Sequence, residues 1–168
     1  MQNTTLCYLE KDGKMLMLHR VKEKDDINAG KFLGVGGHFE EGESPFDCAI
    51  REIYEETGLA VAALRYRGVV TFVSDVYESE QMHLFSSDAF LGEDVFPDYD
   101  PRGVRDGGAC DEGVLCWVDE KDLFSLPMWE GDEVFLRLMA REEPFFSLKL
   151  VYEGDTLVKK VLNGQEIG

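Results

Sequence analysis

The segment from Ser44 to Gly58 carries signals for both ends of a helix. Ser44 can cap the first turn, Pro45 suits the first helical position, and Asp47 completes a near capping box. Gly58 is a natural C-terminal stop, because glycine adopts the left-handed conformation at little cost. We therefore expect a helix over residues 44–58.

Three acidic residues of this helix, Glu52, Glu55 and Glu56, have the spacing i, i+3 and i+4, which places their carboxylates on one face. Like charges in such an arrangement repel one another unless a cation lies between them. Carboxylate oxygens are the ligands that hard divalent ions such as Mg²⁺ or Mn²⁺ prefer. The alternative is a solvated acidic face without a metal. A different face carries the residues that we expect to pack on a sheet: Ala49, Ile50, Ile53 and Thr57.

The rest of the chain alternates between strand patterns and turn signals. Glycines between residues 34 and 37 indicate a close approach of backbones, and residues 92–112 contain enough proline, glycine and aspartate to predict a loop or insertion. A second helix is expected at 130–141. The predicted strands cover residues 4–9, 15–19, 66–73, 82–90, 114–118, 145–152 and 156–161, with hairpins at each end of the chain.

Composition excludes several classes of protein. A length of 168 residues predicts a single domain spanning 1–168, and no apolar run is long enough for a membrane span. The first 20 residues lack the apolar core of a secretory signal, so we expect a cytoplasmic location. With 34 acidic and 17 basic residues, the formal charge of −17 counts against nucleic-acid binding. An anionic small-molecule ligand would need metal ions.

The spacing around the acidic helix completes a longer motif. Gly37 is followed after five residues by Glu43 and after seven more by the run Arg51-Glu52-Ile53-Tyr54-Glu55-Glu56-Thr57-Gly58-Leu59. This pattern resembles the Nudix box, G-x5-E-x7-R-E-U-x-E-E-x-G-U with U aliphatic, at every specified position. The chain is therefore identified by resemblance as a member of the Nudix hydrolases.

The resemblance implies an α/β/α sandwich with a mixed curved sheet and a loop–helix–loop catalytic motif. It also implies that Glu52, Glu55, Glu56 and the carbonyl of Gly36 bind the metal, with Mg²⁺ or Mn²⁺ as cofactor. Arg51 and Glu43 would orient the glutamates, and Glu78 would be a further acidic ligand, with Glu80 as its alternative. The reaction implied is attack of water on a phosphorus of a nucleotide diphosphate linkage. Which of the three glutamates takes the proton stays open.

Outside the box, residues 126–132, 145–147 and 152–155 resemble the MutT-like branch, which hydrolyses oxidised purine triphosphates such as 8-oxo-dGTP to the monophosphate and pyrophosphate. Trp129 and Asp132 match the tryptophan and the second aspartate of a base-binding Trp-Pro-Asp-Asp segment in a mammalian member of that branch, whereas Gly131 does not match the first aspartate. Leu33 stands where a mammalian relative has a base-reading asparagine. The implied substrate-binding residues are Trp129, Asp132, Leu33 and Gly37. The alternative for Trp129 is packing on the core at the start of a helix.

Residues about fifteen positions after the box distinguish other substrate classes of the family. ADP-ribose hydrolases have a proline there, and this chain has Ser74 and Asp75, so that class is disfavoured. Diadenosine polyphosphate hydrolases have a tyrosine in this region, and Tyr77 keeps them as the alternative. A nucleotide sensor without catalysis is a third hypothesis, which the intact Glu52, Glu55 and Glu56 disfavour.

Overall fold

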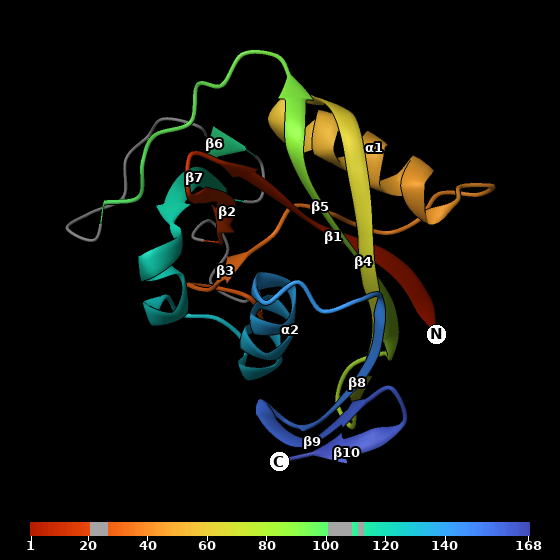
Figure 1. Cartoon of the computed structure of the whole chain (residues 1–168). Helices are drawn as coiled ribbons and strands as arrows, with labels where there is room; N and C mark the ends of the chain where they lie inside the picture. Colours follow the sequence, from red (N-terminus) through yellow and green to blue (C-terminus); the bar gives the residue numbers. More distant parts are fainter. Residues whose placement is uncertain (21–26, 101–108, 111–112) are drawn as a thin grey trace.

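The structure is a computed structural model that describes residues 1–20, 27–100, 109–110 and 113–168. Within them the strands form one curved, mixed sheet (Figure 1). The strands are β1 (Gln2–Lys11), β2 (Lys14–His19), β3 (Phe32–Leu33), β4 (Ala60–Ser74), β5 (Glu80–Leu91), β6 (Ala109–Cys110), β7 (Gly113–Asp119), β8 (Phe146–Glu153), β9 (Thr156–Leu162) and β10 (Gln165–Ile167). The helices are α1 (Pro45–Thr57), α2 (Glu130–Ala140) and the short 3-10 helix η1 (Glu120–Ser125).

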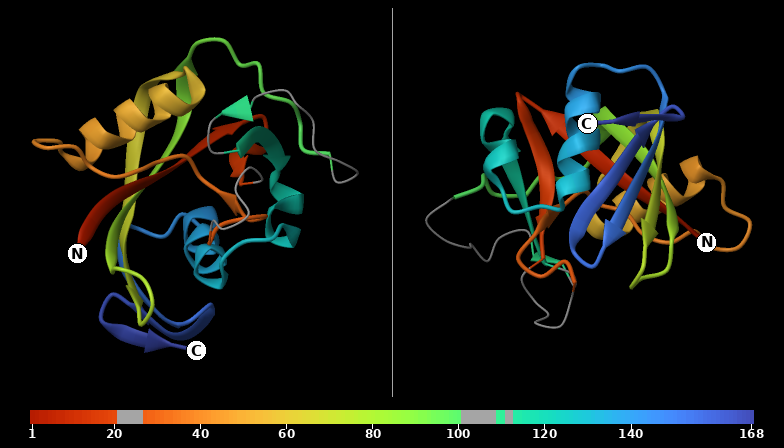
Figure 2. Two further views of the ribbon diagram at one scale, coloured as in Figure 1. Left: turned by 180° about the vertical axis from the view of Figure 1, so that it is seen from behind. Right: turned by 90° about the horizontal axis from the view of Figure 1, so that it is seen from below.

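The strand order is β10-β9-β8-β4-β5-β1-β2-β7-β6, and β3 pairs with β2 off this path. The pairs β1–β5 and β4–β8 are parallel, while β4–β5, β1–β2 and β8–β9 are antiparallel. Helix α1 covers one side of the sheet and α2 lies on the other, as the views in Figures 1 and 2 show. The predicted α/β/α arrangement with a mixed sheet is confirmed.

Helix α1 begins and ends where the sequence predicts. Ser44 accepts a hydrogen bond from the backbone of Asp47, whose side chain accepts one from the Ser44 backbone in return, so the capping box is complete. Gly58 ends the helix with a φ of 74°, in the left-handed region that glycine tolerates best.

The buried face of α1 differs from the prediction at one position. Ala49, Ile53 and Thr57 are buried as expected, but Ile50 is 48% exposed. Cys48, which is fully buried, takes the place that we assigned to Ile50. The reason is that α1 turns its Cys48 edge toward β1, where the Cys48 thiol lies 3.4 Å from the Thr5 hydroxyl.

Two hydrophobic clusters fill the spaces on either side of the sheet. One lies under α1 and includes Ile53, Phe85 and Trp117. The other lies under α2 and includes Phe135 and Phe146. Burial of this apolar area is the main force that holds both helices on the sheet.

Most of the predicted elements are present, with strands somewhat longer than expected. β3, β10 and η1 are short elements that the sequence patterns did not predict. The predicted loop at 92–112 contains β6 at its end, and its residues 101–108 and 111–112 lie outside the described residues. Among the described residues, no helix is long and apolar enough to cross a membrane.

Candidate active site

Arg51 is the centre of a charged network on α1. Its Nε and Nη2 donate to the two carboxylate oxygens of Glu43 at 2.7 and 2.8 Å. Its Nη1 donates to Glu52 at 2.7 Å and to Glu55 at 3.1 Å. Nη2 also reaches the carbonyl of His38 at 3.0 Å. One guanidinium thus joins the turn before the helix to two of the three clustered glutamates.

This network fixes charge as well as position. The hydrogen bonds from Arg51, with a smaller contribution from the Glu40 backbone N–H, lower the pKa of Glu43 to about 2. The hydrogen bonds to Glu43 and Glu52 raise the pKa of Arg51. Glu43 therefore stays ionised across the physiological range, and the permanent positive charge of Arg51 offsets the repulsion among the glutamates.

The third glutamate is held from the other side. Glu56 accepts a hydrogen bond from the Gly36 backbone N–H at 2.8 Å. The segment around Gly36 runs against β1, where Val35 pairs with Cys7 and the carbonyl of Gly37 accepts from Thr5. Because the N–H and C=O of one residue in an extended segment point to the same side, the Gly36 carbonyl lies on the side of Glu56.

Both glycines before α1 lie close to neighbouring groups. A Cβ on Gly36 would lie 1.9 Å from the carbonyl oxygen of Thr5, and a Cβ on Gly37 would lie 2.7 Å from the carboxylate of Glu52. We attributed these glycines to the approach of a backbone carbonyl to an ion. The structure shows that packing on the β1 backbone requires glycine at position 36, and that a side chain at position 37 would displace the Glu52 carboxylate.

In the part of the chain that the structure describes, no three acidic, histidine or cysteine side chains converge as a preformed metal site. Glu52 and Glu55 point to Arg51 and Glu56 to Gly36. Glu78 is exposed and accepts a hydrogen bond from Gln2 at 2.7 Å. Glu80, at the start of β5, is partly buried; burial raises its pKa, and His38 acts in the opposite direction.

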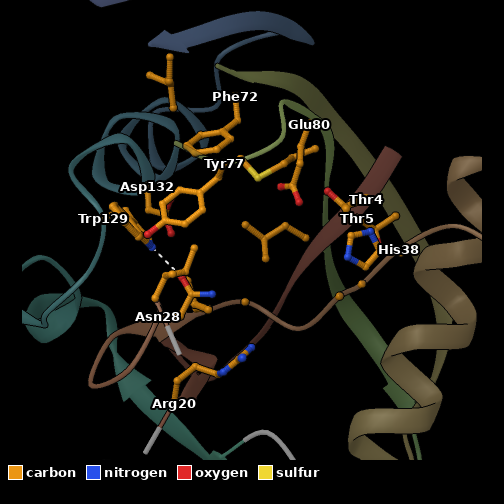
Figure 3. Close-up of a pocket in the computed structure, with 18 of the residues that line it drawn as sticks. Thr4, Thr5, Arg20, Asn28, His38, Phe72, Tyr77, Glu80, Trp129 and Asp132 are labelled. Atoms are coloured by element: carbon orange, nitrogen blue, oxygen red, sulfur yellow. Dashed lines mark hydrogen bonds between the residues drawn. The ribbon is translucent and has the colours of Figure 1, made fainter. Parts of the chain in front are cut away.

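A pocket of about 260 Å³ opens beside this region (Figure 3). One end is lined by Gly36, Gly37 and His38, together with Glu78 and Glu80 across from them. Trp129 and Asp132 lie at the end opposite His38 (Figure 3). The lining also includes aromatic and apolar residues: Leu33, Phe72, Tyr77, Leu150 and Tyr152. The side chains of Glu52, Glu55 and Glu56 lie outside the lining, so the pocket meets the Nudix box at its glycines.

Asp132 lies at the apolar end and is 7% exposed. Burial raises the pKa of its carboxyl to about 7, against a small opposing effect of Lys31. The neighbouring Gly131 has no room for a side chain, since a Cβ there would lie 2.5 Å from Leu150 and 2.7 Å from the Tyr152 hydroxyl. Tyr152 also accepts a hydrogen bond from the Gly131 N–H at 2.7 Å. A side chain at position 131 would therefore displace Leu150 or Tyr152.

The pocket therefore brings together Leu33, Gly37, Trp129 and Asp132, which were predicted from separate parts of the chain. Sequence reasoning missed several other lining residues: Arg20, Asn28, His38, Phe72 and Tyr152. Phe72 and Tyr152 lie on β4 and β8, where their strand pattern indicated only burial. Asn28 lies in a polar turn that carries no motif.

Comparisons with known proteins identify the family of this arrangement. Residues 2–139 match the NUDIX domain. The chain is 33% identical over 145 residues to the uncharacterized Nudix hydrolase YvcI of Bacillus subtilis, covering 84% of this chain and 80% of that protein. It is 28% identical over 164 residues to an oxidized purine nucleoside triphosphate hydrolase of Danio rerio, covering 96% and 94%. The crystal structure of a mutator MutT protein from Bacillus halodurans has a TM-score of 0.81 at 22% identity, covering 97% of this chain and 98% of that one, which shows a shared fold.

Proposed function

The chain belongs to the NUDIX family of hydrolases, and we propose that it hydrolyses a diphosphate bond in an oxidised purine nucleoside triphosphate such as 8-oxo-dGTP. The products would be the nucleoside monophosphate and pyrophosphate. The observation that carries the proposal is the pocket, which runs from the glycines of the Nudix box to Trp129 and Asp132. A nucleotide placed along it has its phosphates beside the box and its base beside the aromatic end.

Nudix hydrolases generally use divalent metal ions, typically Mg²⁺. The donors available here are all hard oxygens, which fits Mg²⁺ or Mn²⁺: Glu52, Glu55, Glu56, the carbonyl of Gly36, and Glu78 or Glu80. The missing side chain of Gly37, which lines the pocket, leaves room for the Glu52 carboxylate beside it. A bound ion would supply positive charge to the phosphate oxygens and lower the pKa of a bound water.

The residues of the chain then have distinct tasks. Arg51 holds Glu43, Glu52 and Glu55 in fixed positions and keeps Glu43 ionised, and the Gly36 N–H holds Glu56. Water attacks the phosphorus, a new P–O bond forms, and the bond from phosphorus to the bridging oxygen breaks as pyrophosphate leaves. One of Glu52, Glu55 and Glu56 takes the proton of the water. Most of the rate enhancement comes from positioning and electrostatics.

At the base end, Trp129 offers an apolar ring for stacking, and Asp132 can hydrogen-bond to purine nitrogens. Leu33 also lines the pocket, and Gly37 lines its phosphate end. A carboxyl with a pKa near 7 can act as donor or acceptor at neutral pH, which suits the altered hydrogen-bond pattern of an oxidised purine. The relative from Danio rerio, named for oxidised purine triphosphates, supports this choice of substrate.

The test is product analysis with Mg²⁺ on 8-oxo-dGTP, dGTP, diadenosine tetraphosphate and ADP-ribose, followed by steady-state kinetics. We expect the highest kcat/KM with 8-oxo-dGTP and release of pyrophosphate. Asp132→Asn replaces an acceptor by a donor without a change of shape, so it should reduce discrimination between 8-oxo-dGTP and dGTP more than it reduces turnover of dGTP. Retention of the wild-type preference by this variant contradicts the proposed role of Asp132.

Hydrolysis of diadenosine polyphosphates is the second candidate, because Tyr77 lines the same pocket. A wild-type preference for diadenosine tetraphosphate over every mononucleotide would favour this candidate and overturn the first, while leaving the Nudix chemistry intact. Failure to hydrolyse any of the four compounds, with tight binding of one, would instead favour a nucleotide sensor.

A further inference from the structure

The indole of Trp129 is held by a turn that lies far away in the sequence. Its Nε1 donates a 2.7 Å hydrogen bond to the side-chain oxygen of Asn28, shown as a dashed line in Figure 3. The ammonium of Lys31 lies over the same ring, 4.5 Å from its centroid. Tyr152 contacts the ring edge-on, with centroids 5.5 Å apart. The ring is therefore fixed at an edge by Asn28 and covered on a face by Lys31.

The turn itself is firmly connected to the chain around it. The Gly30 N–H donates to the carbonyl of Arg20 at 2.6 Å, and the Lys31 N–H donates to that of Asn28 at 2.9 Å. Phe32 donates to the carbonyl of Pro127 at 2.8 Å, two residues before Trp129. Residues 27–32 and 127–129 are thus joined by backbone and side-chain contacts into one unit at the rim of the pocket.

These contacts have a direct consequence for stacking. An indole that is hydrogen-bonded at Nε1 and covered by a cation cannot rotate without loss of both contacts. Because Trp129 lines the pocket, these contacts hold its ring where a ligand can reach it. Ordering a free tryptophan on binding would cost side-chain entropy, and that cost is already met in the folded protein. Lys31 also acts electrostatically on Asp132, so the same turn influences both groups at the base end.

We propose that Asn28 and Lys31 are positioning residues that preorganise Trp129 for stacking on the base of the substrate. This inference rests on the proposed function for the identity of the base. It assigns specificity to a turn that carries no part of the Nudix box and no match to the MutT-like base-binding segment.

A double-mutant cycle tests the inference. Asn28→Ala should raise the KM for 8-oxo-dGTP about fivefold, the effect of one neutral hydrogen bond, and leave kcat within about twofold. In a Trp129→Ala background the same substitution should have no further effect, because Asn28 acts through the indole. Asn28→Asp, which keeps an acceptor oxygen, should restore most of the affinity. If the KM increases of Asn28→Ala and Trp129→Ala multiply in the double variant, the two residues act independently and the proposal is overturned.

Lys31 offers an independent pair of variants. Lys31→Met removes the cation and keeps an apolar chain of similar length, so KM should rise about threefold, whereas Lys31→Arg keeps the cation and should remain near wild type. Equal KM values for the methionine and arginine variants contradict a role for the cation. Far-UV circular dichroism identifies any variant that fails to fold. If a variant at Asn28 or at Lys31 does not fold, the variants at the other residue still test the proposal.

Fluorescence gives a readout that needs no substrate. Trp117 is 3% exposed and donates to Asp94, so quenching by acrylamide reports mainly on Trp129. Asn28→Ala should increase quenching, and unchanged quenching contradicts the positioning role. If the wild type acts only on diadenosine tetraphosphate, the proposed function fails, and the same cycle measured with that compound still decides the role of Asn28.

Discussion

Glu43 in the Nudix box and Asp132 at the base end of the pocket have opposite pKa shifts. Glu43 lies in the turn before α1, outside the pocket lining, where it is paired with Nε and Nη2 of Arg51, and its pKa falls to about 2. At the base end, Asp132 is buried among apolar side chains, and its pKa rises to about 7. A permanent cation keeps the first group charged, whereas burial lets the second change charge near neutral pH. The first arrangement suits binding of metal and phosphate, and the second suits reading of a base.

The largest expected effect lies at the charged end. Glu56→Gln should lower kcat by at least about a hundredfold without a change of fold, because a metal-binding carboxylate is lost. Glu41→Gln removes a charge from the exposed turn before α1 and should leave kcat unchanged. Steady-state kinetics with Mg²⁺ measures both. Turnover of the Glu56 variant close to that of the wild type would refute its assignment as a ligand.

The next effect lies at the base end. Trp129→Ala should raise KM for 8-oxo-dGTP at least about tenfold, equivalent to roughly 1.4 kcal/mol of binding, with a smaller change in kcat. Phe145→Ala is the matched control, since Phe145 is an aromatic residue that is 56% exposed and lies outside the pocket lining. If both variants change KM equally, the loss does not come from stacking in the pocket.

The two ends also differ in how far the sequence predicts them. The helix α1 and its acidic residues follow from local signals, since the caps at Ser44 and Gly58 and the i, i+3, i+4 spacing act within a few turns. Ile50 was misassigned because periodicity alone does not fix which edge of a helix faces the sheet. Cys48, two residues before Ile50 and on another side of the helix, is buried in its place.

The base end depends on contacts that no local pattern carries. Asn28 reaches Trp129 across 101 positions of sequence, and Phe72 and Tyr152 meet through the parallel pairing of β4 with β8. Resemblance to relatives supplied Trp129 and Asp132, but it gave no reason for glycine at 131. Only the packing of Leu150 and Tyr152 into that space explains it.

A smaller effect is the loss of folding stability that the buried carboxyl of Asp132 causes as the pH rises. Its folded-state pKa of about 7 lies above the ordinary value of 3.8, so the native state binds the proton more tightly and loses stability as the pH rises between these values. From pH 5 to pH 8 this loss amounts to about 2–3 kcal/mol. Asp132→Asn carries no charge and should escape it, so its melting temperature should exceed that of the wild type by roughly 5 °C or more at pH 8.

The difference in melting temperature between wild type and Asp132→Asn should shrink toward pH 5, where Asp132 is protonated in the native state. Glu130→Gln removes an exposed carboxyl from the first turn of α2 and should follow the wild-type curve at both pH values. Thermal melts at pH 5 and pH 8 measure the three proteins. A difference between wild type and Asp132→Asn that is the same at both pH values would mean that burial of the charge is not its cause.

The smallest expected effect is stabilisation by metal, and it returns to the charged end. An ion that binds the native state and only weakly the unfolded chain stabilises by RT ln(1 + [L]/Kd), which is about 1.4 kcal/mol at ten times Kd and raises the melting temperature by roughly 3–5 °C. A chain with a formal charge of −17 also gains stability from screening by any salt, so NaCl at matched ionic strength is the necessary control. In the wild type and in Glu41→Gln, Mg²⁺ should raise the melting temperature more than NaCl does. This difference between Mg²⁺ and NaCl should be smaller in Glu56→Gln. The difference should persist in Trp129→Ala, because the indole lies at the other end of the pocket from the box glycines. Equal melting curves in Mg²⁺ and in NaCl would show that the clustered glutamates bind no specific ion. The assignment of metal binding to that end would then be wrong.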